Sequence, residues 1–188
     1  MTEQDILRLI KTDPWMMNII RIAESLNLPD WVIGAGFVRN KVWDYLHGYS
    51  RTGVYTPDID LVYYDPVGND ERADEELSRQ LRQETNIPFE IVNQFYAHRW
   101  NSLPPYGSIE NALASWPETA TGIGIKIRDG ELELLAPHGI EDLVNLIVRP
   151  SPTFREGIEK VRERALEKQW LRKWPKLKFV GNASGYSG

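Results

Sequence analysis

The 188-residue sequence predicts an α/β (α+β) fold, a mixed and twisted sheet of about five strands with flanking helices. Short apolar runs alternate along the chain with longer segments whose apolar residues recur at the 3.6-residue period of a helix. Residues 121–135 form two alternating segments around an Asp-Gly pair, which is a typical β-hairpin turn. Hydrophobic residues make up 41% of the chain and charged residues 26%, which is ordinary for a globular protein with a buried core.

Two helices are predicted before the first strand. Apolar residues at helical spacing between positions 3 and 27 indicate both of them. Asp13 and Pro14 are a typical start for the second helix, because an aspartate caps free N–H groups and proline is tolerated in the first turn. The apolar run Trp31–Gly34 then predicts the first strand.

A turn of small residues follows that strand. Gly34, Ala35 and Gly36 lead into a predicted helix from about Phe37 to His47. The first N–H groups of a helix are free and its dipole is positive at that end, so such a turn can bind phosphate. The alternative is a purely structural role, in which the glycines only permit a tight turn.

Arg39 lies in the first turn of this helix, where a positive charge opposes the helix dipole. An anionic ligand at the same helix end would reverse that effect. The alternative is a surface arginine paired with Asp44 or Asp65.

Two acidic residues lie two positions apart in the next predicted strand. Residues at that spacing share a face, so Asp58 and Asp60 project together while Ile59 and Leu61 face the other way. The two charges repel unless a cation lies between them, and Mg2+ commonly binds one or two carboxylates plus substrate phosphates. The pair is therefore a candidate site for Mg2+ or Mn2+, and a solvated strand edge is the alternative.

Two later acidic residues lie among apolar neighbours in predicted strands. A charged amphipathic helix at 69–84 precedes a predicted strand at Ile87–Val92, in which Glu90 is the single charge. A charge among apolar neighbours either faces solvent or serves a site. Glu133, in the second strand of the hairpin, fits simple alternation, so Glu90 is the preferred candidate.

Similar signals predict the remaining organisation. Short helices are expected at 93–99 and 108–114, and a longer one from Phe154 to about Trp170. The chain divides into a domain at 1–150 that includes the N-terminal helices, a C-terminal helical extension at 151–180 and a disordered tail at 181–188.

Composition restricts the class of function. The absence of cysteine excludes disulfides, thiolate metal sites and cysteine nucleophiles, and is typical of an intracellular protein, here expected in the cytoplasm. Neither a signal peptide nor an apolar run of about 20 residues is present, so no membrane partner is expected. A net charge of −5 disfavours extensive RNA binding, although basic residues cluster from Arg149 to Lys178.

The ordered motifs resemble a known family. GFVRNKVWD and DIDLVYYD are similar to the head-domain signature of the DNA polymerase β-like nucleotidyltransferase superfamily, in particular its class II branch of tRNA CCA-adding enzymes and poly(A) polymerases. With FEIVNQ, WPETATGIGIKI and APHGIEDLVNLIVRP, the chain resembles still more a group of small bacterial stand-alone nucleotidyltransferase-like proteins. This resemblance covers roughly Trp31–Pro150.

The resemblance implies transfer of an NMP from an NTP to a hydroxyl acceptor, with release of pyrophosphate. The carboxylates of Asp58, Asp60 and Glu90 would hold Mg2+ or Mn2+, and the phosphates would be bound by Gly34, Ala35, Gly36 and Arg39. The acceptor is unidentified; a small molecule or a protein is favoured over long RNA because the chain is acidic.

The sequence also departs from the class II tRNA enzymes. Ala35 replaces the first glycine of the pair, and Asn40 replaces the aspartate after Val-Arg. Glu118 and Thr119 lie near the place of the R-R-D-F-T-x-N-A motif without matching it. Because a neck domain and its E-D-x-x-R motif have no counterpart here, authentic CCA addition is not expected.

Two other functions remain open. The chain could be a non-catalytic nucleotide-binding or regulatory module that keeps the same fold. It could also bind RNA ends through its basic C-terminal segment, where Trp170 and Trp174 lie among lysines and arginines. Packing of a C-terminal helix explains these two tryptophans equally simply.

Overall fold

The structure, a computed structural model of the chain, describes residues 1–50, 58–68, 71–100 and 103–181. The helices in these residues are α1 (Glu3–Lys11), α2 (Pro14–Ser25), α3 (Gly36–Leu46), α4 (Glu71–Thr85), α5 (Gln94–Ala97), α6 (Ile109–Ala114), α7 (Glu141–Val144), α8 (Gly157–Glu167) and α9 (Trp170–Lys173). The strands are β1 (Val32–Ile33), β2 (Ile59–Tyr63), β3 (Phe89–Asn93), β4 (Gly124–Arg128), β5 (Glu131–Leu135), β6 (Ile147–Val148) and β7 (Lys178–Phe179).

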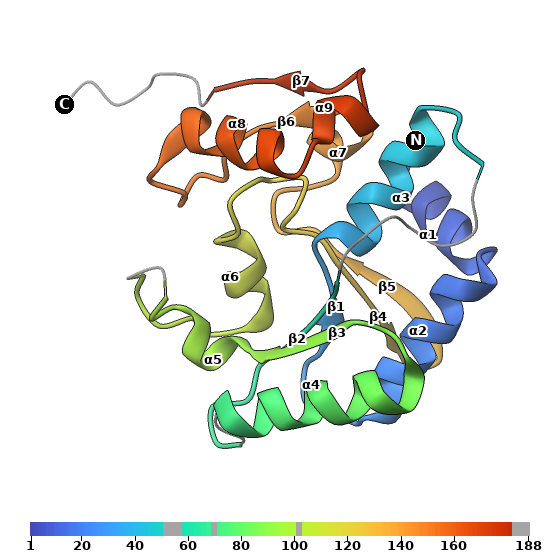
Figure 1. The fold of residues 1–188 in the computed structure, drawn as a ribbon, viewed down its shortest axis with the longest axis vertical. Coiled ribbons are helices and arrows are strands. Elements are labelled where there is room, and N and C mark those ends of the chain that lie inside the picture. Colours follow the sequence, from blue (N-terminus) through green and yellow to red (C-terminus); the bar gives the residue numbers. More distant parts are fainter. Residues whose placement is uncertain (51–57, 69–70, 101–102, 182–188) are drawn as a thin grey trace.

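A five-stranded mixed sheet with the order β3-β2-β1-β4-β5 forms the centre of the fold (Figure 1). β2 and β3 are parallel and are connected through α4, whereas the other neighbouring pairs are antiparallel. A separate pair, β6 and β7, is parallel. The predicted α/β fold with a mixed sheet of about five strands and flanking helices is therefore confirmed.

The two faces of the sheet pack against different helices. Ile59, Leu61 and Tyr63 belong to the main core, which also contains buried residues of α1 to α4 and of α8 and α9. Val62 instead belongs to a smaller core under α6. Because strand residues two apart share a face, Asp60 lies on the α6 side of the sheet, away from the main core.

Several predicted elements differ at their ends. Asp58 precedes β2 rather than lying within it. The predicted strand at 121–128 begins only at Gly124, because the preceding residues form a turn in which the N–H groups of Thr121 and Gly122 both donate to the Glu118 carbonyl. The predicted tail at 181–188 lies outside the described residues except for Gly181.

The C-terminal segment packs into the main core. The predicted helix from Phe154 to Trp170 is two helices, α8 and α9, separated by Gln169 in the left-handed conformation. Trp170 and Trp174 are buried and contact Trp43 of α3 edge-on, with ring centroids 5.4 and 5.2 Å apart. Their packing role is confirmed, and neither ring is available to stack on a base.

None of the helices in the described part of the chain has the length and apolar character that crossing a bilayer requires.

A buried ion pair connects α2 to α3. The Asp13 carboxylate caps α2 by accepting the N–H groups of Trp15 and Met16 at 3.0 and 3.2 Å. It also accepts a hydrogen bond from Lys41 of α3, and both side chains are almost completely buried. The predicted start of the second helix is confirmed, and the same residue fixes the position of α3.

We predict that Asp13→Ala lowers the free energy of unfolding by about 3 kcal/mol, because it removes a helix cap and leaves the Lys41 ammonium buried without this partner. Asp13→Asn keeps a capping oxygen and should cost less. Urea unfolding followed by circular dichroism measures both. Asp5→Ala, at an exposed cap of α1, is the control, and an equal loss for Asp5→Ala and Asp13→Ala would contradict the prediction.

Candidate active site

Pairing of β1 with β2 brings the small-residue turn against the second aspartate. The two strands are antiparallel with Ile33 opposite Leu61, and Gly34 N–H donates to the Asp60 carbonyl at 2.9 Å. Gly34 packs against Trp116: a Cβ added at Gly34 would lie 2.7 Å from the indole ring. Glycine is therefore required at position 34 by a close approach.

The unusual backbone conformation of the turn falls on Ala35. This residue has φ 50° and ψ −120°, a combination that favours glycine, and it stands just before α3. The sequence interpretation had assigned the turn to its glycines. The structure places the strain on the alanine that replaces a family glycine.

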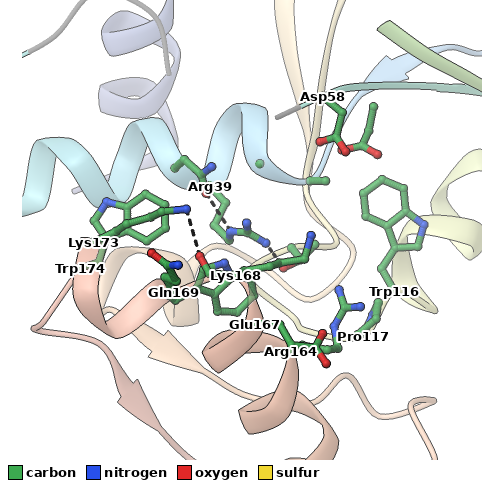
Figure 2. A pocket seen from close by; sticks show the side chains of 16 residues that line it. Arg39, Asp58, Trp116, Pro117, Arg164, Glu167, Lys168, Gln169, Lys173 and Trp174 are labelled. Atoms are coloured by element: carbon green, nitrogen blue, oxygen red, sulfur yellow. Dashed lines mark hydrogen bonds between the residues drawn. The ribbon is translucent and has the colours of Figure 1, made fainter. Parts of the chain in front are cut away.

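The start of α3 opens into a cavity of about 590 Å3 (Figure 2). Ala35, Gly36 and Arg39 line it, whereas Gly34 does not. No side chain in the described residues makes a capping hydrogen bond at this helix start. Phe37 N–H donates to the Gly34 carbonyl at 3.2 Å, so the helix dipole and the remaining N–H groups of the first turn lie beside a space large enough for a small-molecule ligand.

Asp58 and Asp60 line the same cavity. Burial, together with the negative charges of Asp58 and Glu90, raises the pKa of Asp60 to about 7, while Arg39 and Lys168 act in the opposite direction. The two candidate acids are thus brought together beside the start of α3. Their mutual repulsion is the kind that a divalent cation relieves.

Glu90 lies beside Asp60 but opens onto a different hollow. The two residues are register partners in the parallel pair of β2 and β3. The Glu90 side chain is about half exposed, its carboxylate is 3.8 Å from Arg82 of α4, and it lines a neighbouring hollow between α4 and β3. Within the described ranges, no three His, Asp or Glu side chains are grouped closely enough to hold a metal ion.

The rival third acid, Glu133, lies in β5, which β1 and β4 separate from β2, and it does not line the cavity. It forms an ion pair with Arg128 on the hairpin, with 2.9 Å between Arg128 Nε and Glu133 Oε2. This position on the hairpin agrees with the alternating pattern of its strand, which is the reason that the sequence favours Glu90 over Glu133.

Arg39 is a buried cation on the cavity wall. It donates through Nη1 to Thr121 Oγ1 at 2.6 Å, and its guanidinium lies 5.0 Å from the ring of Trp43 and 4.3 Å from that of Trp170. Burial lowers the pKa of Arg39 to about 10, and the charge of Glu118 is the largest influence in the opposite direction. The arginine is thus held by long-range contacts and remains charged at neutral pH.

The surface ion pairs considered from the sequence are replaced by other contacts. Asp44 accepts a hydrogen bond from Trp174 Nε1 at 2.8 Å. Asp65 accepts the N–H groups of Val67 and Gly68 in its own loop.

Glu118 is the main site residue whose role the sequence did not reveal. It is 1% exposed and accepts a hydrogen bond from Arg164 Nε of α8 at 2.9 Å. It is therefore a buried anion that pairs directly with Arg164 and whose negative charge also favours the charged form of Arg39. The sequence offered only its place in the WPETAT segment, because Arg39 and Arg164 both lie far from Glu118 in the chain.

A family model described as nucleotidyltransferase matches residues 21–179. The match includes the strand, turn and helix around Ala35 and both cavity-lining aspartates. The chain belongs to this nucleotidyltransferase family. No curated protein shows detectable sequence similarity to it.

Solved structures agree with this assignment. The nucleotidyltransferase is 32% identical to a protein whose NMR structure revealed a CCA-adding enzyme head domain; the TM-score is 0.84, and the match covers 95% of this chain and 96% of that one. The predicted resemblance to such head domains is confirmed.

Larger enzymes share the fold at lower identity. A Thermotoga maritima CCA-adding enzyme complexed with tRNA is 18% identical with a TM-score of 0.58, and a CCA-adding enzyme with CTP is 19% identical with a TM-score of 0.52. The matches cover 94% and 92% of this chain but only 42% and 48% of those enzymes. The chain spans just under half the length of these proteins, and the likeness shows the fold alone.

We predict that Ala35→Gly stabilises the nucleotidyltransferase by roughly 1 kcal/mol. Relief of a strained φ returns about 1–3 kcal/mol, and the greater freedom of glycine in the unfolded chain removes up to about 1 kcal/mol. Denaturant unfolding measures the change. Ala112→Gly, in the middle of α6, is the control and should destabilise by about 1 kcal/mol; a loss of stability for Ala35→Gly would contradict strain at this position.

Proposed function

We propose that this nucleotidyltransferase moves an NMP from an NTP to a hydroxyl acceptor with the help of Mg2+ or Mn2+. The observation that carries the proposal is a single cavity lined by two acidic residues, by the uncapped start of α3 and by a buried arginine. Acids suit a metal, and the helix start and arginine suit phosphates. The likeness to a CCA-adding enzyme whose structure was solved with CTP supports an NTP as the donor.

The acidic residues fit a hard divalent cation. Mg2+ is usually bound by one or two carboxylates together with substrate phosphates, so Asp58 and Asp60 are a sufficient protein contribution. Burial is the main cause of the raised pKa of Asp60, and repulsion from Asp58 and Glu90 adds to it; bound positive charge would offset both effects. When bound, the ion would neutralise phosphate charge and lower the pKa of the attacking hydroxyl.

Glu90 is the proposed third carboxylate. Its register position beside Asp60 and the effect of its charge on the pKa of Asp60 support this role. Its ion pair with Arg82 is half exposed and therefore weak, so it opposes a turn of the side chain toward Asp60 only slightly.

The proposed reaction is a substitution at the α-phosphorus. An acceptor oxygen forms a bond to phosphorus, the bond from that phosphorus to the bridging oxygen breaks, and pyrophosphate leaves with the electron pair. The hydroxyl proton passes to solvent. The start of α3 and Arg39 stabilise the phosphate charge, with Arg39 already fixed by Thr121 and two indole rings before any ligand binds.

The acceptor is proposed to be a small molecule or a protein. The chain carries a net charge of −5, which disfavours long RNA. Trp170 and Trp174 are 2% and 1% exposed, so the C-terminal segment lacks the aromatic platform that single-strand binding requires.

We predict that Asp58→Asn and Asp60→Asn each lower nucleotidyl transfer at least about 100-fold, because each removes negative charge from the proposed metal site. Pyrophosphate release from each of the four NTPs, with Mg2+ or Mn2+ and a panel of acceptors, is the measurement. Thermal shift by NTP with metal, in the same variants, reports binding separately. Native protein that shows neither a metal-dependent shift nor pyrophosphate release would refute the proposal.

Glu90→Gln and Glu133→Gln form a matched pair for the third carboxylate. We predict that Glu90→Gln lowers transfer at least about tenfold, whereas Glu133→Gln leaves it unchanged because Glu133 is outside the cavity. The Mg2+ concentration that gives half of the maximal rate of pyrophosphate release should also be higher for Glu90→Gln than for the native protein. Equal rates for Glu90→Gln and native protein would remove Glu90 from the site.

A further inference from the structure

The C-terminal segment forms a wall of the candidate active site. Arg164 and Lys168 from the end of α8 and Lys173 from α9 line the same cavity as the two aspartates. Figure 2 shows these basic side chains on the side of the cavity formed by the C-terminal helices, with Asp58 and Trp116 elsewhere on its rim. The segment predicted from the sequence as an extension therefore contributes directly to the site.

The position of this wall is fixed by a sharp bend. Gln169 has φ 56° and ψ 37°, so α8 stops and the chain turns directly into α9. The Lys173 ammonium donates to the Lys168 carbonyl at 3.0 Å across the bend. Because Trp170, the first residue of α9, and Trp174, its C-cap, are buried against Trp43, the bend cannot move away without opening the core.

Positive charges on this wall lie near one another and near Arg39. Burial lowers the pKa of Lys173, and the charges of Lys168 and Arg39 lower it further. Crowded like charges are unfavourable in the unliganded protein and are relieved by a bound anion. Glu167 also lines this wall, but Arg164, Lys168 and Lys173 outnumber it, so the wall is complementary to a ligand with several negative charges.

Lys168 differs from the other cations of the wall. Arg164 is paired with Glu118, and Lys160, two turns earlier in α8, is paired with Glu163. In the part of the chain that the structure describes, the Lys168 ammonium has no hydrogen-bond or ion-pair partner, although the residue lines the cavity. Its exposed position leaves it available to a ligand in solution.

We propose that the α8–α9 wall is a polyphosphate-binding half of the site, in which Lys168 contacts the β- and γ-phosphates of the NTP. The inference rests on the proposed function for the identity of the ligand. The start of α3 and Arg39 hold one side of the triphosphate, and Lys168 with Lys173 holds the other. The pyrophosphate that leaves the reaction is then stabilised by cations from the C-terminal segment.

The inference also explains why the C-terminal segment is built into the core. A flexible extension would have to be ordered each time a nucleotide binds, at a cost in conformational entropy. Here Trp170 and Trp174 hold the cations in place before binding. Removing the segment would expose these core residues, so point substitutions are the appropriate test.

The probe is inorganic tripolyphosphate, titrated calorimetrically into the full chain in the presence of a chelator, so that no metal contributes. Lys168→Ala should weaken its binding roughly tenfold or more, because a charge-assisted contact is lost, and Lys168→Arg should retain most of the affinity. Lys160→Ala, on the same helix and paired with Glu163, should bind like the native protein. Denaturant unfolding of each variant shows whether the fold is kept.

The outcomes separate this inference from the proposed function. Native protein that fails to bind tripolyphosphate, or Lys168→Ala that binds it as well as native protein, overturns the inference even if transfer activity is present. Lys168-dependent binding that persists in the Asp58→Asn/Asp60→Asn double variant supports it. The same binding in a protein that shows neither a metal-dependent NTP shift nor pyrophosphate release supports the anion site and refutes the transferase proposal instead.

Discussion

The burial of the Arg39 guanidinium is the constraint on which the site and the fold both depend. Removing a cation from water is costly unless hydrogen bonds, aromatic faces and opposite charges replace the water. Thr121 supplies a hydrogen bond, Trp43 and Trp170 supply the ring faces, and Glu118 supplies the largest opposing charge. These partners come from α3, the loop before β4 and α9, so satisfying one arginine requires three distant segments of the chain to meet. The cavity lies where they meet.

Acidic and basic side chains of this cavity are both in surroundings that disfavour their charged forms. Burial and neighbouring acids raise the pKa of Asp60, while burial lowers the pKa of Arg39 and Lys173. A bound cation alone would neutralise the acids but increase the repulsion on the basic wall. A bound anion alone would relieve the basic wall but increase the repulsion on the acids. A metal ion together with a polyphosphate relieves both at once. The electrostatics of the site therefore favour a ligand of the composition that nucleotidyl transfer uses.

Local patterns in the sequence predicted much of the fold and one half of the site. The Asp-Gly hairpin and the proximity of Asp58 and Asp60 depend on residues close in sequence, and the structure has both, although Asp58 precedes β2 and the strained φ of the turn falls on Ala35 rather than on a glycine. Glu118 and the basic wall were not predicted, because an ion pair from Glu118 to Arg164 depends on packing rather than on spacing. The break at Gln169 was also missed, since nothing in its composition interrupts the helical period around it.

Two strained residues stand on opposite walls of the cavity, Ala35 before α3 and Gln169 before α9. Glycine would adopt either conformation without strain, but it would also widen the range of backbone geometries available there. A side chain at these positions costs folding free energy and narrows that range, which is useful where helix N–H groups, Arg39 and Lys168 must converge on one ligand. Each is followed closely by a buried core residue, Phe37 two positions after Ala35 and Trp170 directly after Gln169, which anchors the adjoining helix. We infer that strain at these two residues helps to preorganise the proposed phosphate-binding groups.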